Sequence, residues 1–152
     1  MGQGNYSKGK AFKPINFKNY KIGVMICYES IFPEISRSFI KNNAQLLFVI
    51  TNDGWFGPSA GPIEHYLFSR LRAIETGKYI VRSAKTGISA IIDDKGNVIK
   101  EIGLFKRGYF IQKVPLNSFK TPYTYIGESW IILLVIIILG FKILRRWKII
   151  NS

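Results

Sequence analysis

Residues 21 to 30 read KIGVMICYES and decide the type of fold, because a short apolar run ends directly in a cysteine followed by polar residues. An apolar run of this length is typical of a strand that is buried on both faces of a sheet. With Ser30 as N-cap, apolar residues recur every four positions from 31 to 39, which predicts a helix of about three turns. The stretch therefore predicts strand, turn and helix, with Cys27 at the turn.

The same order of strand, loop and helix is predicted again downstream. Residues 46 to 50, LLFVI, form a second buried-strand pattern, and the loop that follows over 51 to 61 contains three glycines and one proline. A helix is predicted from Pro62 to the residue before Gly77, because proline suits a first helical turn and glycine suits a C-terminal cap. Its apolar residues fall on one face, and they are Ile63, Leu67, Leu71 and Ile74.

Strands and turns dominate the next part of the sequence. Strands are predicted at 79–84, 88–92, 98–102 and 109–114, and residues 94 to 97 can supply the positive φ of a tight hairpin turn. Strands that first alternate with helices and then form a hairpin indicate an α/β fold with a mixed sheet. Sites in such sheets gather at the carboxyl ends of strands, where both Cys27 and the pair Asn52-Asp53 stand.

Composition narrows the classes of function. The chain has 152 residues, 47% of them hydrophobic, and a formal net charge of +13 that is concentrated at its two ends. No zinc-finger spacing, RNP-like aromatic pattern or long basic helix accompanies this charge, so no nucleic-acid partner is expected. The single cysteine excludes an internal disulfide and a multi-cysteine metal site, and no metal or cofactor is predicted. Cys27 is therefore either a buried apolar thiol or a reactive one.

Composition changes near Pro122, and residues 123 to 144 are predicted as a transmembrane helix. Every residue from Trp130 to Phe141 is apolar or glycine, and the 20 residues 125–144 would extend for about 30 Å as a helix. Basic residues follow this span, so the positive-inside rule places a basic tail, 145–152, in the cytoplasm and residues 1 to 122 outside. The alternative is a buried core helix.

The position of Cys27 suits a nucleophile. A thiol at a strand-to-helix turn can face a substrate while backbone N–H groups stabilise the thiolate. Attack near neutral pH also needs a neighbouring base or cation. His65 lies on the helix predicted after Pro62, where it could be a surface, structural or substrate-lining residue.

Two stretches resemble a known enzyme family. Gly23 to Glu29, GVMICYE, looks like the nucleophile segment of the nitrilase superfamily. Thr51 to Gly57, TNDGWFG, strongly resembles the apolipoprotein N-acyltransferase family, as do His65 and Arg82-Ser83 further along. The resemblance runs from about Gly4 to Arg146.

The resemblance implies a fold, a reaction and a location. Residues 1 to 122 would be the C-terminal half of a nitrilase-like α-β-β-α sandwich. The reaction would move a fatty acyl chain from a phospholipid donor, through a thioester on Cys27, to the N-terminal amine of a diacylglyceryl-cysteine lipoprotein. The enzyme would belong to the bacterial inner membrane, with its catalytic part on the periplasmic or outer side.

The family pattern also implies roles for residues. Cys27, Tyr28 and Glu29 would be catalytic, with the Tyr28 N–H as an oxyanion donor. Substrate-binding residues would be Asn52, Trp55, Phe56 and His65. Glu29 could instead be a helix-start carboxylate, and Trp55 a core aromatic beneath a loop.

One departure from the family affects activity. Nitrilase-type sites also use a glutamate base and a lysine that precede the cysteine by many residues, and neither segment is present in this sequence. We therefore expect the chain to be inactive alone, as a fragment, a split-gene product or a truncated pseudo-enzyme, with the missing N-terminal half as a possible partner. Two alternatives remain at this point, a nitrilase-like amidase and a non-enzymatic membrane-tethered module.

Overall fold

A computed structural model describes residue 9 and residues 11–150, which form one six-stranded sheet, two covering helices and a C-terminal helical segment. The tail predicted for 145–152 lies partly outside the described residues. The strands lie in the sheet in chain order. They are β1 (Ile15–Phe17), β2 (Tyr20–Ile26), β3 (Leu46–Thr51), β4 (Ile80–Ala84), β5 (Ser89–Ile92) and β6 (Val98–Ile102).

The predicted mixed sheet is confirmed. Strands β2, β3 and β4 are parallel, whereas β1, β5 and β6 join antiparallel to their neighbours. The predicted hairpin joins β5 to β6, and Gly96 adopts φ +82° in its turn. Because β2, β3 and β4 run in the same direction, the residues that follow them meet at one edge of the sheet, and this edge carries Cys27.

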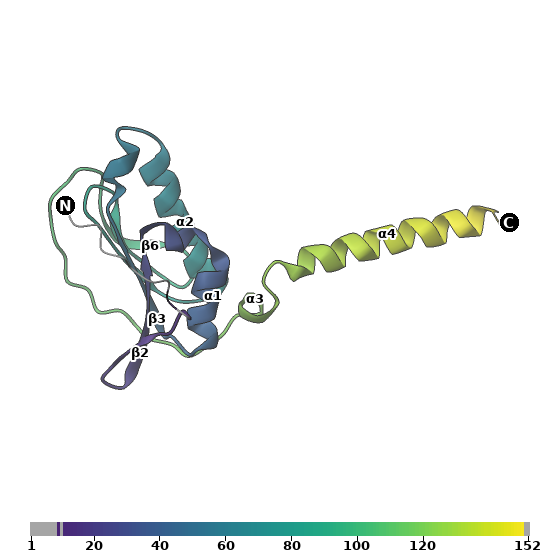
Figure 1. Cartoon of the computed structure of the whole chain (residues 1–152), viewed down its shortest axis with the longest axis horizontal. Coiled ribbons are helices and arrows are strands. Elements are labelled where there is room, and N and C mark those ends of the chain that lie inside the picture. The colour runs from purple at the N-terminus through teal and green to yellow at the C-terminus, as the bar shows by residue number, and fades with distance from the viewer. Residues whose placement is uncertain (1–8, 10, 151–152) are drawn as a thin grey trace.

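Two helices cover one face of the sheet (Figure 1). Helix α1 (Pro33–Lys41) follows the short 3-10 helix η1 (Cys27–Ile31), and α2 (Gly61–Thr76) follows a second one, η2 (Asp53–Phe56). The covered face supplies the core, where the fully buried side chains from the strands include Met25, Leu47, Val49, Ile80 and Ile92. The described residues therefore form a layer of helices packed on one face of a sheet.

The opposite face of the sheet is apolar but only partly covered. Alternate residues on this face are Ile26, which is 64% exposed, and Ile50, which is 52% exposed. Further half-buried residues of this face are Ile22, Val24, Phe48 and Val81. The prediction of strands buried on both faces is wrong for the described residues, because helices lie against one face alone.

Helix α2 presents its apolar side outward. The apolar residues that share one face are exposed, and they are Ile63, Leu67, Leu71 and Ile74. The buried side is mostly polar, with His65, Ser69, Arg72 and Thr76. The predicted end is confirmed, since Gly77 adopts the left-handed conformation at the C-cap.

Two local predictions are wrong. Ser30 does not cap a helix: it lies inside η1, and α1 begins after Phe32. The strand predicted at 109–114 is absent among the described residues, and 103–121 is coil apart from a turn.

Lys78 fixes part of this coil by donating to the carbonyl of Asn117 at 2.9 Å. Burial, together with the positive charge of Lys120, lowers the pKa of Lys78 to about 8.

The C-terminal segment differs from the predicted transmembrane helix over 123–144. It is divided into α3 (Pro122–Ile126) and α4 (Ser129–Ile150), because Gly127 breaks the helix with φ +55°. Within the part of the chain that the structure describes, no helix is both long enough and apolar enough to cross a membrane. Among the described residues the alternative of a buried core helix is not met, since the apolar side chains of 130–139 are exposed. The predicted basic tail is helical as far as Ile150.

Candidate active site

Cys27 occupies a sharp turn at the carboxyl end of β2. It is half-buried and adopts φ +52°, in the left-handed region that residues with a Cβ rarely enter. Such a backbone costs of order 1–3 kcal/mol and persists only where the surrounding structure over-determines it. The turn must therefore be stabilised by specific contacts.

Three side chains supply those contacts, two on one side of the turn and one on the other. Before Cys27, the Ile26 N–H donates to the Glu29 carboxylate at 2.7 Å. After it, the carbonyl of Cys27 accepts from the Ser30 hydroxyl at 3.0 Å and lies 3.1 Å from His65 Nε2. Ser30 Oγ and His65 Nε2 are themselves 2.9 Å apart.

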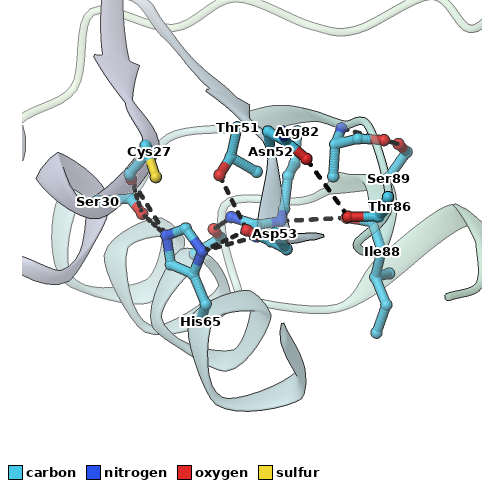
Figure 2. Close-up of polar contacts among 12 residues, drawn as sticks. Cys27, Ser30, Thr51, Asn52, Asp53, His65, Arg82, Thr86, Ile88 and Ser89 are labelled. Atoms are coloured by element: carbon cyan, nitrogen blue, oxygen red, sulfur yellow. Dashed lines mark hydrogen bonds and ion pairs between the residues drawn. The ribbon is translucent and has the colours of Figure 1, made fainter. Parts of the chain in front are cut away.

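A buried chain of polar groups continues from His65 into the core (Figure 2). His65 Nδ1 lies 2.8 Å from Asp53 Oδ1, and Arg82 Nη2 donates to Asp53 Oδ2 at 2.8 Å. Thr51 adds a hydroxyl bond to the same carboxylate at 2.9 Å. His65, Asp53 and Arg82 are at most 2% exposed, so water does not compete for these contacts.

The Asp53 carboxylate assigns the role of one ring nitrogen of His65. Nδ1 faces the Asp53 carboxylate, so Nδ1 carries a proton and donates. Nε2 faces the Ser30 hydroxyl and the Cys27 carbonyl, whereas no contact joins the imidazole to the Cys27 sulfur. His65 thus lies beneath the nucleophile turn and contacts its backbone.

The buried guanidinium of Arg82 donates hydrogen bonds to several acceptors in the core. It points from β4 toward α2, where Nη1 donates to Ser69 Oγ at 3.0 Å, and Nε donates to the Ile88 carbonyl at 3.1 Å. Gly87 makes room for its counter-ion, since a Cβ on Gly87 would lie 1.9 Å from Asp53 Oδ2. The Thr86-Gly87 turn therefore requires glycine for close packing.

The environment of Asp53 makes stability depend on pH. Burial alone would raise the pKa of Asp53, but the His65 hydrogen bond and the charge of Arg82 lower it below its ordinary value. Because the folded-state pKa lies below the unfolded value of about 3.9, this stabilisation is complete above about pH 4. It is lost as the pH falls through the lowered pKa.

We therefore expect the stability difference between the wild type and Asp53→Asn to shrink in acid. Asparagine has no carboxylate to protonate, so only the wild type loses this contribution as the pH falls below about 4. Urea unfolding followed by circular dichroism at a series of pH values measures the difference. A constant difference between pH 6 and pH 2 would contradict the assignment.

The remaining predicted site residues lie around the same edge. Tyr28 is half-exposed and packs against Phe56 and His65, with ring centroids 6.2 and 5.6 Å away. Asn52 is exposed and accepts from the Gly54 N–H at 3.2 Å. Trp55 is 88% exposed, so the alternative of a core aromatic is wrong. Tyr28 and Phe56 also line a small pocket with Ile31, Gly61, Glu64, His65 and Phe68.

Sequence reasoning missed the importance of Asp53, Arg82 and Ser30. One signal was available, because Arg82 alternates with Ile80 on the inward side of β4 and a buried arginine needs an opposite charge. The identity of its partner was not available, since Asp53 is 29 residues away in the sequence. No group of three or more histidine, cysteine, aspartate or glutamate side chains among the described residues could bind a metal ion.

Comparison with known proteins identifies the family. The family model described as Carbon-nitrogen hydrolase matches residues 3–121. The chain belongs to this family. The match includes the nucleophile turn and the buried network.

Individual relatives of the chain share one name. An apolipoprotein N-acyltransferase of Rickettsia bellii is 44% identical over 138 residues, which are 88% of this chain and 27% of the relative. One from Shewanella oneidensis is 32% identical over 147 residues, 95% of this chain and 28% of the relative. The chain thus resembles apolipoprotein N-acyltransferases as predicted, and it spans between 27% and 28% of the length of these two.

Solved structures agree on the fold. A carbon-nitrogen hydrolase from Helicobacter pylori G27 matches with a TM-score of 0.60 and 16% identity, over 67% of this chain and 43% of that one. Saccharomyces cerevisiae Nit3, a nitrilase-superfamily member, matches with a TM-score of 0.58 and 25% identity, over 66% and 40% of the two chains. The predicted nitrilase-like α/β fold is confirmed.

Proposed function

We propose that this chain supplies the nucleophile of an apolipoprotein N-acyltransferase. The observation that carries the proposal is the position of Cys27, which lies in a left-handed turn at the carboxyl end of a parallel strand. Strained backbone of this kind is characteristic of functional sites, where the surrounding structure maintains it. The resemblance to relatives named apolipoprotein N-acyltransferase supports the choice of reaction.

The proposed reaction has two balanced steps. In the first, the Cys27 thiolate attacks the ester carbonyl of a phospholipid, a carbon–sulfur bond forms, and the lysophospholipid leaves as its alkoxide oxygen takes up a proton. In the second, the amine of a diacylglyceryl-cysteine lipoprotein attacks the thioester, a carbon–nitrogen bond forms as the carbon–sulfur bond breaks, the nitrogen loses one proton to a base, and the Cys27 thiolate is released. The thioester divides one difficult transfer into two easier ones.

Residues beside Cys27 have separate proposed roles. The Tyr28 N–H follows the nucleophile and would donate to the oxyanion formed in each step. The half-exposed Tyr28 ring, the half-buried Phe56 and the exposed Trp55 offer aromatic surface to an acyl chain or acceptor. Asn52 shapes the turn before Trp55 through its bond to Gly54.

The proposed reaction also needs a base and a cation. Glu29, the acidic residue of the nucleophile turn, already accepts the Ile26 N–H and acts there as a structural brace. We propose that a glutamate and a lysine come from further polypeptide that packs on the partly covered apolar face of the sheet, where Ile26 and Ile50 are exposed. The pairing of this face with a second sheet would complete an α-β-β-α sandwich.

A chimera tests the proposal. The matching segment of the Rickettsia bellii apolipoprotein N-acyltransferase, which is 44% identical, is replaced by this chain in the full-length relative. We expect the chimera to N-acylate a diacylglyceryl lipopeptide from a phospholipid donor, as mass spectrometry would record, and the 152-residue chain alone to be inactive. An inactive chimera that folds, or release of free fatty acid without lipopeptide acylation, would contradict acyl transfer; the latter would indicate an amidase-like hydrolase.

A further inference from the structure

We propose that Ser30, His65, Asp53 and Arg82 act as positioning residues that keep Cys27 in its left-handed conformation. This inference rests on the proposed role of Cys27 as the nucleophile. It assigns to the buried network a task in presenting the sulfur, in addition to its part in the core. All four side chains are almost completely buried.

The contacts end on the backbone of the nucleophile. Ser30 Oγ donates to the Cys27 carbonyl at 3.0 Å, and His65 Nε2 lies 3.1 Å from the same oxygen. A residue at φ +52° can return to the common region only if its flanking peptide units rotate, and such a rotation breaks both contacts. These two contacts therefore oppose relaxation of the turn.

The remainder of the network fixes the side chains of Ser30 and His65. Asp53, which follows β3, orients the imidazole through Nδ1, and Arg82 on β4 fixes the carboxylate through a 2.8 Å ion pair. The network thus connects two neighbouring strands to the turn that follows a third. Proton transfer to the sulfur is not the role of this network, because its contacts reach the Cys27 carbonyl and not Sγ.

Alkylation of the full chain tests the effect on the sulfur. Cys27 is the single cysteine, so the rate of iodoacetamide labelling reports one site. Ser30→Ala removes a buried hydroxyl that donates to the carbonyl three residues earlier. Ser36→Ala is its matched control, because Ser36 is equally buried and also donates three residues back, to Pro33, at 2.9 Å. We expect Ser30→Ala to slow labelling about fivefold, the effect of one hydrogen bond, and Ser36→Ala to leave it unchanged.

Two replacements of His65 separate positioning from core stability. The amide of His65→Gln reaches the place of Nε2 and can donate to the Cys27 carbonyl, whereas the shorter amide of His65→Asn reaches the place of Nδ1 and keeps the contact with Asp53. If His65 positions Cys27 through its carbonyl, we expect faster labelling of Cys27 in the glutamine variant than in the asparagine variant. If His65 contributes only to core stability, we expect faster labelling in the asparagine variant than in the glutamine variant. The labelling rates would then follow the melting temperatures of the two variants.

A second measurement observes the contact directly. Cysteine labelled with ¹³C at its carbonyl gives one resonance in this chain, and loss of a hydrogen bond moves a carbonyl resonance upfield. We expect an upfield shift in Ser30→Ala and none in Ser36→Ala. Equal or faster labelling in Ser30→Ala, or faster labelling in His65→Asn than in His65→Gln, would overturn the inference. Iodoacetamide needs no acyl donor, so an inactive chimera would refute the proposed function without deciding this test.

Discussion

Replacing Cys27 by serine in the chimera is expected to lower lipopeptide N-acylation at least about 10³-fold, the scale on which loss of a nucleophile acts in other acyl-transfer enzymes. A serine hydroxyl fits the same turn but is almost fully protonated near neutral pH, whereas a thiol yields the reactive anion far more readily. We also expect the acyl-enzyme adduct to disappear from the intact mass spectrum.

The control for this substitution is Ser36→Ala, which changes a buried residue of α1 without contacting the nucleophile turn. Its N-acylation rate should match that of the unsubstituted chimera. If the Cys27→Ser chimera retains more than about a tenth of the rate, the thioester route is refuted.

Replacing Arg82 by methionine is expected to lower the free energy of unfolding of the chain by about 3–5 kcal/mol, the usual effect of breaking a buried ion pair from one side. Arg82 and Asp53 are each 1% exposed, so the loss of the guanidinium leaves a buried carboxylate without its counter-charge. It also leaves Ser69 and the Ile88 carbonyl without a donor. Urea denaturation followed by circular dichroism provides the measurement.

Arg70→Met is the matched control, because Arg70 lies on α2, is half-buried and donates to the Gly96 carbonyl without an acidic partner in that bond. We expect this variant to lose no more than about 1.5 kcal/mol. Adding Asp53→Asn to Arg82→Met should recover part of the stability, since it removes the orphaned charge. Additive losses in the double variant would contradict the buried ion pair.

The parts of the fold that the sequence predicted well are those set by contiguous patterns. The strands β2 and β3 each coincide with an apolar run, and the loop between β5 and β6 contains glycine where positive φ is required. In these segments the local preference and the tertiary environment agree, so the pattern alone sufficed.

Long-range packing explains where the structure differs from the predictions made from the sequence. Strand β1 has exposed, mixed residues and exists because it pairs with β2, whereas the apolar residues of 109–114 find no neighbouring strand. The apolar stripe of α2 predicts burial, yet the polar side faces the core because His65 and Arg72 find buried partners there. A helical pattern identifies a face but does not determine what lies against it.

The site was predicted in part. Cys27, Tyr28 and Phe56 were expected near one another from the strand ends and the family resemblance, and the structure brings them to the same edge. The supporting network could not be predicted, because its ion pair joins residues from a loop and a strand that are distant in sequence.

At Cys27 the left-handed backbone and the need for a reactive side chain favour different residues. Glycine would adopt this geometry with the least strain, but it carries no sulfur, while any residue that carries a reactive atom introduces a Cβ that the conformation disfavours. Substitutions that make the protein more robust and substitutions that keep it functional are thus opposed at residue 27, so selection for stability alone would eliminate the nucleophile.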